Sequence, residues 1–307
     1  MLGLAEIRSF VGVPTAVVAM FAATALVGCG STTVPGETVS LSVTRDFGGE
    51  QIKETKTVPL SAGLTAMRQL QAAAETETAY GGKFVTAIDG VKQDLAGGYD
   101  WLFYVDGIES DRGATGRRLS VDQVVQWDYH RWLNVKSGGA TIGAYPRPLS
   151  TRGTRIECLP ARSGECTKLR ERFTADQIAT DGSRDGRAVR VIAGVWSEIK
   201  KLAGVPDLQQ NAADGGAFAR FIGSGNELGL ELVDDDGERA RVLGTGAGLA
   251  AAFAQGDDVT WLFTGVDRDG VAAAIDLLGS PTVAGRFALA VDADGPIALP
   301  VARGAAR

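Results

Sequence analysis

Tyr99-Asp100-Trp101-Leu102-Phe103-Tyr104-Val105-Asp106-Gly107 is the segment that indicates most about the fold of the first half of the chain. Its apolar and aromatic residues predict a β-strand, and the Asp-Gly pair at its end is typical of a tight turn. Side chains alternate between the two faces of a strand, so Trp101 and Phe103 share one face while Leu102 and Tyr104 share the other. One of these faces must belong to a core, so we expect at least half of the aromatic cluster to serve packing.

The segments around this stretch predict further strands and one helix. Ser61 can cap a helix whose apolar residues recur on one face, at positions 64, 67, 70 and 74. The expected strands alternate in polarity and span residues 39–43, 51–58, 84–88 and 123–132. The sequence therefore predicts an α+β chain with an N-terminal β-rich domain over residues 39–134.

Three motifs follow one another in this region. They are Val85-Thr86-Ala87-Ile88-Asp89-Gly90, then the Tyr99–Gly107 stretch, then Asp122-Gln123-Val124-Val125-Gln126-Trp127. In this order they resemble the transcobalamin and intrinsic-factor C-terminal-like domain family, whose bacterial members are mostly of unknown function. The resemblance covers residues 39–134, under a third of the chain.

The resemblance implies a small β-rich fold and suggests a ligand. In the cobalamin carriers this domain closes over one face of the corrinoid, beside a larger helical barrel. No repeated helix pairs that could form such a barrel are found in this sequence. Cobalamin binding is therefore a hypothesis, and the ligand-facing residues of the family would map to Tyr99, Trp101 and Phe103.

The second half of the chain has a different order of predicted strands and helices. Residues 135–150 are rich in Gly, Ser and Pro and predict a linker. Residues 151–307 alternate strand and helix patterns, which predicts a mixed α/β domain with partly parallel strands and no recognised family. Within it we expect a helix over residues 247–254 and another over 270–278, the latter capped by Asp267.

The N-terminal residues predict where the protein is located in the cell. Residues 10–28 form an apolar run that ends in Leu26-Val27-Gly28-Cys29, which matches the lipobox of bacterial lipoproteins. We expect residues 1–28 to be a signal peptide, Cys29 to carry lipid and residues 29–38 to form a tether. The alternative is an N-terminal membrane helix with a chance cysteine. Either interpretation places the body on the outer, extracytoplasmic face of the cell membrane.

The other two cysteines fit an exported protein. With Cys29 lipidated, Cys158 and Cys166 remain as an even pair in an oxidising compartment. The loop between them contains Pro160 and Gly164 and can close, and a bridge there stabilises a fold by roughly 2–3 kcal/mol in the chain-entropy model. We expect a structural disulfide.

Composition and motifs disfavour several function classes. The net charge of −6 disfavours nucleic-acid binding, and a single His with three Cys leaves little for zinc or for histidine-based catalysis. Gly244-Thr245-Gly246-Ala247-Gly248 lacks the spacing of a dinucleotide fingerprint, so we interpret it as a tight turn at a helix start, where free amides could bind an anion. Asp234-Asp235-Asp236-Gly237-Glu238 lacks EF-hand spacing and predicts a solvated turn.

The leading hypothesis is a non-enzymatic, lipid-anchored protein that captures a small molecule, with a corrinoid as the concrete candidate. It requires no cofactor or metal and could present its ligand to a membrane transporter. His130, the sole histidine, is expected to be an ordinary strand side chain rather than a base or cobalt ligand. The predicted ligand contacts are aromatic: Tyr99, Trp101, Phe103, Tyr104 and Trp127.

Two other functions remain open at this point. One is an envelope scaffold or adhesion module that recognises protein or glycan, and the other is a hydrolase hidden in residues 151–307. A pocket lined by Trp101, Tyr104 or Trp127 would favour capture, a flat exposed apolar patch would favour the scaffold, and convergent carboxylates would favour the hydrolase.

Overall fold

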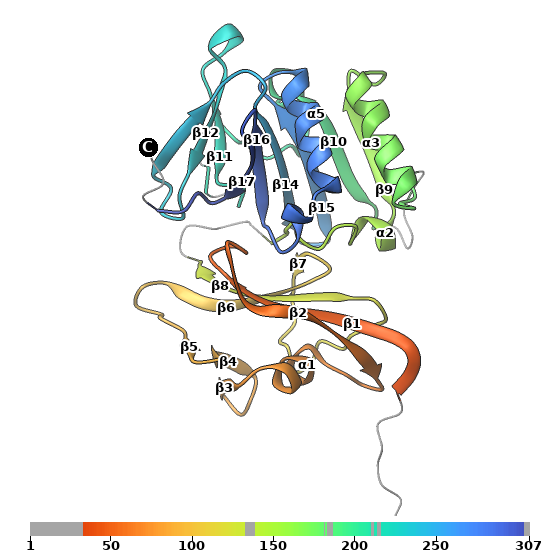
Figure 1. Ribbon diagram of the computed structural model, residues 1–307, viewed down its shortest axis with the longest axis vertical. Coiled ribbons are helices and arrows are strands. Elements are labelled where there is room, and N and C mark those ends of the chain that lie inside the picture. Colours follow the sequence, from red (N-terminus) through yellow and green to blue (C-terminus); the bar gives the residue numbers. More distant parts are fainter. Residues whose placement is uncertain are drawn as a thin grey trace, which may run out of the picture. The chain divides into compact units, whose positions relative to one another are not determined.

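The computed structural model of the 307-residue chain describes residues 33–132, 139–180, 182, 187–209, 212–213 and 216–303 (Figure 1). The predicted signal peptide, Cys29 and the first residues of the predicted tether lie outside the described residues. Residues 33–307 form one compact unit. Strands make up 42% of the structure and helices 18%, so the predicted α+β class with a β-rich N-terminal part is confirmed. The division at residues 135–150 stays a prediction.

The N-terminal region is built on a five-stranded sheet with the strand order β2-β1-β8-β6-β7. Strands β1 and β8 run parallel, while the other neighbours are antiparallel. A helix, α1, and a second, three-stranded sheet, β3-β4-β5, complete the region. The bounds are β1 Thr33–Arg45, β2 Glu50–Ser61, α1 Ala66–Ala73, β3 Thr76–Ala79, β4 Phe84–Ile88, β5 Val91–Lys92, β6 Tyr99–Val105, β7 Ile108–Glu109 and β8 Val124–Arg131.

Two local expectations in this region change. Strand β1 starts at Thr33, so residues 33–38 of the expected tether belong to a strand in which Thr33 pairs with Ser61. Because Ser61 is the last residue of β2, it does not cap the helix. The N-cap is Thr65, whose hydroxyl accepts a hydrogen bond from the Arg68 amide (3.3 Å).

The C-terminal region contains a six-stranded sheet with the order β17-β16-β14-β15-β10-β9 and a three-stranded sheet, β11-β12-β13. Strand β10 is parallel to β9 and to β15, and the remaining pairs are antiparallel, as a partly parallel domain requires. Strands are β9 Thr154–Leu159, β10 Val189–Val195, β11 Ala219–Ile222, β12 Gly229–Val233, β13 Arg239–Leu243, β14 Gly248–Gln255, β15 Asp258–Gly265, β16 Ala288–Asp292 and β17 Gly295–Leu299. Helices are α2 Leu149–Arg152, α3 Gly164–Ala175, α4 Trp196–Ile199 and α5 Arg268–Asp276, with 3-10 turns η1 Gly225–Glu227, η2 Leu277–Gly279 and η3 Pro281–Val283.

The helix expected over residues 247–254 is wrong, because this segment is the buried strand β14. Alanine favours helices in isolation, but tertiary burial outweighs that preference. β14 pairs with β15 and β16, and its small residues let helix α5 approach closely. A Cβ at Gly248 would lie 2.0 Å from the Gly270 carbonyl oxygen of α5. The predicted cap of α5 is confirmed, since the Asp267 carboxylate accepts from the Gly270 amide (2.9 Å).

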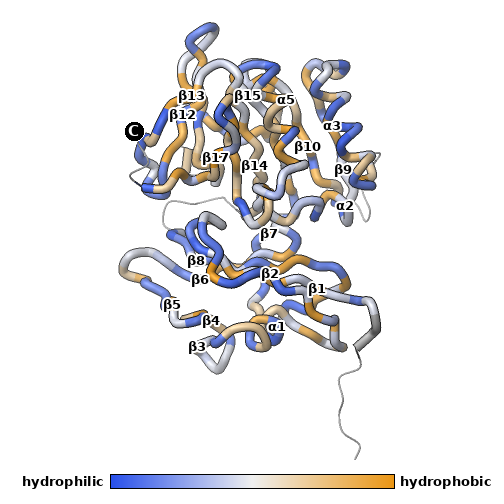
Figure 2. Tube along the Cα trace, viewed as in Figure 1, coloured by the Kyte–Doolittle hydropathy of each residue, from blue (hydrophilic) through white to orange (hydrophobic). Residues whose placement is uncertain are grey.

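Both faces of the N-terminal sheet contribute residues to hydrophobic cores. One face forms a core with α1 and β4 that contains Trp101, Trp127 and Met67. The opposite face contributes Phe47 and Tyr104 to a core made largely by the C-terminal region. Figure 2 shows the apolar residues of that region concentrated along β10, β14 and β15. None of the helices in the described residues is long and apolar enough to cross a membrane.

Candidate functional site

The predicted ligand residues occupy two neighbouring antiparallel strands, β6 and β8. Phe103 pairs with Trp127, and Trp101 pairs with Tyr129. The register puts Tyr99, Trp101, Phe103 and Trp127 on one face, whereas Tyr104 is buried on the opposite face. Trp101 and Tyr104 therefore cannot line one common pocket.

Five rings lie on the first of these faces in two stacked groups, here together called the aromatic ladder: Tyr99, Trp101 and Tyr129, and Phe103 and Trp127. The ring centroids are 5.6 Å apart for Tyr99 and Tyr129, 5.3 Å for Trp101 and Tyr129, and 4.8 Å for Phe103 and Trp127. These separations are typical of favourable aromatic pairs. The sequence prediction missed Tyr129, although the period-two alternation of β8 already placed it beside Trp127.

The ladder combines buried and half-buried rings. Trp101 (6% exposed) and Trp127 (3%) belong to the core, while Tyr99, Phe103 and Tyr129 are half-buried at its margin. The Trp101 indole donates to the Val91 carbonyl (3.0 Å), which fixes its ring. The Trp127 indole N–H is buried without a partner in the described part of the chain. An unsatisfied buried donor of this kind costs about 1–3 kcal/mol.

The ladder is uncharged at neutral pH. Burial, with the nearby carboxylate of Asp235, raises the pKa of the Tyr99 phenol, while Arg303 partly opposes this effect. Burial raises the pKa of the Tyr129 phenol as well, and Asp94 adds to it. The rings therefore present apolar faces with neutral hydroxyls, a surface suited to ring stacking and hydrogen bonding.

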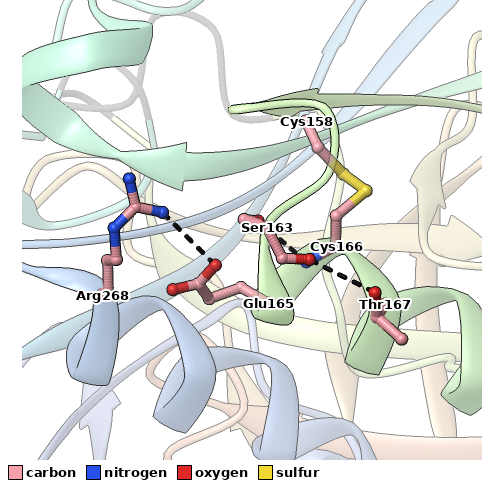
Figure 3. The surroundings of a disulfide bond; sticks show 6 residues. All are labelled: Cys158, Ser163, Glu165, Cys166, Thr167 and Arg268. Carbon is pink, nitrogen blue, oxygen red and sulfur yellow. Dashed lines mark hydrogen bonds and ion pairs between the residues drawn. A yellow bond between two sulfur atoms is a disulfide. The ribbon is translucent and has the colours of Figure 1, made fainter.

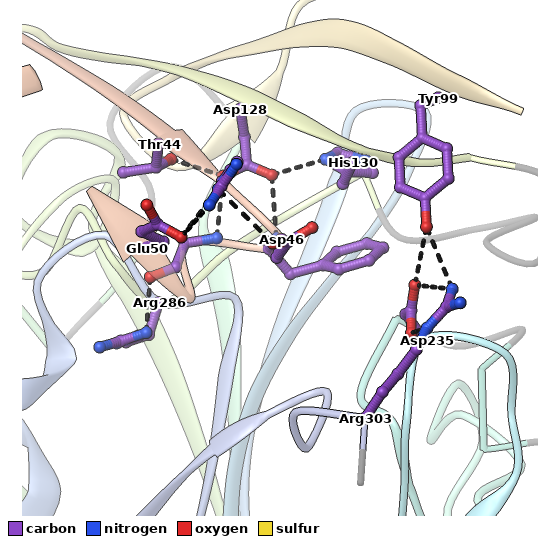
Figure 4. Close-up of polar contacts among 12 residues, drawn as sticks. Thr44, Asp46, Glu50, Tyr99, Asp128, His130, Asp235, Arg286 and Arg303 are labelled. Atoms are coloured by element: carbon purple, nitrogen blue, oxygen red, sulfur yellow. Dashed lines mark hydrogen bonds and ion pairs between the residues drawn. The ribbon is translucent and has the colours of Figure 1, made fainter. Parts of the chain in front are cut away.

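On the opposite face of the sheet, Asp128 of β8 is completely buried and accepts four hydrogen bonds (Figure 4). The Thr44 hydroxyl donates to it, as do the amides of Phe47 (3.0 Å) and Gly48 (2.8 Å). His130 Nδ1 lies 2.7 Å from the same carboxylate. Asp128 thus holds the β1–β2 turn in place.

That turn inserts Phe47 into the core of the C-terminal region. The ring lies 4.2 Å from His130, 4.6 Å from Phe218 and 5.3 Å from Phe287, centroid to centroid. His130 is only 2% exposed and lies on the face of β8 away from the ladder. The histidine therefore packs as a strand side chain, and no sequence signal pointed to the roles of Asp128 and Phe47.

A second polar link joins the ladder to the C-terminal region (Figure 4). The Tyr99 hydroxyl donates to Asp235 in the β12–β13 turn (3.3 Å), and Arg303 donates two hydrogen bonds of 2.6 Å to the same carboxylate. Arg131 pairs with Asp236 of the same turn. The acidic run is thus the expected hairpin turn with residues 236–238 exposed, but two of its acids, Asp235 and Asp236, also meet arginines from distant segments.

The Asp235 link predicts an acid-sensitive contribution to stability. Burial acts to raise the pKa of Asp235, but hydrogen bonds and the charge of Arg303 outweigh it and hold that pKa below its usual value. Such a carboxyl stabilises the fold above its unfolded pKa of about 3.9, and this contribution is lost as the pH falls through the folded pKa. We expect Arg303→Met to reduce the loss of stability between pH 5 and pH 3, measured by urea unfolding.

The matched control for that prediction is Arg45→Met, because Arg45 pairs with the exposed Glu50. Exposed pairs contribute little, so the control should keep the wild-type pH dependence. An Arg303→Met variant whose stability follows the same pH curve as the wild type would contradict the assignment.

The predicted disulfide is confirmed. Cys158 at the end of β9 is bridged to Cys166 in the first turn of α3, with their Cα atoms 5.8 Å apart (Figure 3). The Ser163 hydroxyl caps this helix by accepting from the Cys166 amide (3.1 Å). The bridge thus fastens the start of α3 to the edge strand of the large sheet.

The glycine-rich segment 244–248 does not start a helix. It connects β13 to β14, and its Gly246 amide donates to Asp267 (2.7 Å). The Gly246 amide therefore already has a partner within the chain. Because no helix starts here either, the segment lacks the helix N-terminus at which an anion was expected to bind. In the part of the chain that the structure describes, no group of three or more His, Cys, Asp or Glu could hold a metal ion.

One comparison with known proteins gives a match within the N-terminal region. Residues 63–131 match the family model of a domain of unknown function, DUF4430. No curated protein matches the chain. Solved structures similar to it include a Ruminococcus gnavus protein to which metal binding has been ascribed, at 14% identity and a TM-score of 0.24, over 30% of this chain and 95% of that one. Haptocorrin in complex with Cbi is another, at 18% identity and a TM-score of 0.25, over 32% of this chain and 25% of haptocorrin.

Proposed function

We propose that the chain is a lipid-anchored, extracytoplasmic binding protein that captures a small ring-bearing molecule at the aromatic ladder and does no catalysis. The anchor is the lipid on Cys29, in the lipobox Leu26-Val27-Gly28-Cys29. The ladder supplies the contact area, and the C-terminal region holds its sheet through Phe47 and Asp128.

The observation that carries this proposal is the half-buried margin of the ladder. Tyr99, Phe103 and Tyr129 have rings that are fixed by stacking yet partly open to solvent. Rigid aromatic rings of this kind bind planar ligands at small entropic cost.

A corrinoid is the first ligand to test. This choice depends on the sequence resemblance of residues 39–134 to the transcobalamin C-terminal-like domain. His130 lies on the opposite face of β8, so a corrinoid at the ladder would not be bound through this imidazole. Presentation of the ligand to a membrane transporter would follow capture.

The test is a calorimetric and absorbance titration of residues 30–307 with cobalamin and with cobinamide. We expect saturable one-to-one binding that weakens by about tenfold or more in Phe103→Ala, which removes a half-buried ring worth about 1.4 kcal/mol. Trp132→Ala is the matched control, because this exposed ring lies beyond the end of β8 and outside the ladder. Urea unfolding verifies that both variants remain folded.

Two results would overturn the proposal at different levels. The absence of heat and of a spectral change at millimolar ligand would remove the corrinoid. Equal binding by Phe103→Ala and the wild type would remove the ladder as the site. Binding of residues 30–307 to envelope proteins or glycans, in place of a small molecule, would establish the scaffold function.

A further inference from the structure

The β3–β4 hairpin exposes two neighbouring aromatic side chains. Tyr80 is 83% exposed and Phe84 is 49% exposed, and their rings meet edge to face with centroids 6.4 Å apart. Single exposed apolar residues are ordinary, but a contiguous exposed pair marks a surface that contacts something apolar. Neither ring belongs to the three hydrophobic cores of the described residues.

The backbone of the hairpin turn projects these rings outward. Tyr80 has a φ of +51°, and Gly81 and Gly82 follow with φ of +69° and +83°. The turn is closed by the amides of Gly82 and Lys83, which both donate to the Ala79 carbonyl (3.2 Å). A left-handed backbone at a bulky residue costs about 1–2 kcal/mol, and packing within the chain does not recover it here. Such strain is typical of residues that serve a contact outside the fold.

Chain length places this hairpin near the membrane. Only three residues lie between the predicted lipidated Cys29 and Thr33, where β1 starts, so the four Cα–Cα steps reach about 14 Å at full extension. The first residues of β1 lie at the same end of the N-terminal region as α1 and the β3–β4 hairpin (Figure 1). A lipid on Cys29 would hold this end of the region next to the bilayer.

The chemistry of the hairpin tip suits the headgroup layer. Tyrosine is enriched at membrane interfaces, where its ring is buried and its hydroxyl stays wet. Phe84 adds apolar area to the tip. We propose that the tip of the β3–β4 hairpin, residues 80–84, inserts into the headgroup region of the anchoring membrane and fixes the orientation of the body. This inference rests on the lipid anchor of the proposed function.

The experiment replaces the lipid by a nickel-chelating lipid that holds an N-terminal hexahistidine tag on residues 30–307, since residues 33–307 are one compact unit. A Lys83→Cys substitution carries a nitrobenzoxadiazole label, as Cys158 and Cys166 are bridged. Vesicles contain equimolar phosphatidylcholine and phosphatidylglycerol with a doxyl-lipid quencher. We expect quenching at position 83 to exceed that of a Val242→Cys label by about threefold or more. Val242 is a matched exposed position in the C-terminal region.

The combined substitution Tyr80→Ser and Phe84→Ser should abolish the excess quenching, and its urea midpoint shows that the fold is kept. Equal quenching at positions 83 and 242, or excess quenching that persists in the serine variant, would overturn the inference. Lipidation is measured separately, by mass spectrometry of the full chain against Cys29→Ala. A failure of the anchor is thereby distinguished from a failure of the hairpin contact.

Discussion

Replacing Asp128 by Ala should destabilise the protein by about 3–5 kcal/mol, because it leaves several buried donors without an acceptor. The carboxylate is completely buried and accepts from the Thr44 hydroxyl and from the amides of Phe47 and Gly48. His130 loses its Nδ1 partner as well. Urea unfolding at neutral pH measures the effect.

Two further variants serve as an intermediate case and as a control for Asp128→Ala. Asp128→Asn keeps one acceptor oxygen and the side-chain shape, so its loss of stability should lie between those of wild type and Asp128→Ala. Glu50→Ala removes an exposed carboxylate that pairs with Arg45, and exposed pairs of this kind contribute about 0–1 kcal/mol. If Asp128→Ala is as stable as Glu50→Ala, the carboxylate does not hold the β1–β2 turn.

The second large effect is expected for Gly48→Ala in the same turn. A Cβ at position 48 would lie 1.9 Å from the carbonyl oxygen of Gly285, a backbone atom that cannot move aside cheaply. The Gly48 carbonyl also accepts from Arg286 (2.6 Å), so any shift breaks this bond. We expect a loss of about 3 kcal/mol or more, since strain and a broken buried contact act together.

Gly63→Ala is the matched control, because it measures the cost of a left-handed backbone at alanine without a steric clash. Gly63 has a φ of +71°, close to the +73° of Gly48, and a Cβ there would meet nothing within 4 Å. It should cost only the left-handed penalty of about 1–2 kcal/mol. Equal losses of stability in the two glycine variants would show that the approach to Gly285 is not a tight contact.

Both predictions concern how the ladder sheet is supported. Phe47 reaches the core of the C-terminal region, and Gln126 of β8 donates to the Gly285 carbonyl (2.7 Å). The face of the sheet opposite the ladder is thereby fixed by the C-terminal region. The ladder rings are therefore held on a sheet that is packed on both sides, which suits a preformed binding surface.

Much of the local structure could be predicted from the sequence. The alternation around Trp101 predicted a strand, and Asp267 predicted the cap of α5; both features depend on neighbouring residues only. The same is true of the Cys158–Cys166 bridge, whose partners are eight positions apart. Most of the ladder could be predicted as well, because side chains two positions apart on a strand share a face. This alternation relates Tyr99, Trp101 and Phe103 on β6, and strand pairing adds Trp127 of β8.

Short-range patterns were therefore enough to predict the clearly alternating strands, the N-cap of α5 and the disulfide, whereas the cap of α1 was placed at Ser61 instead of Thr65. The strand over residues 248–255 could not be predicted in this way, since burial between β15 and β16 outweighs the helix preference of alanine. The same holds for three of the four hydrogen-bond partners of Asp128, which lie 80 to 84 positions earlier in the chain, and for the place of Phe47 in the core of the C-terminal region. Contacts at such separations leave no local pattern, because what a buried side chain meets is set by the packing of distant segments.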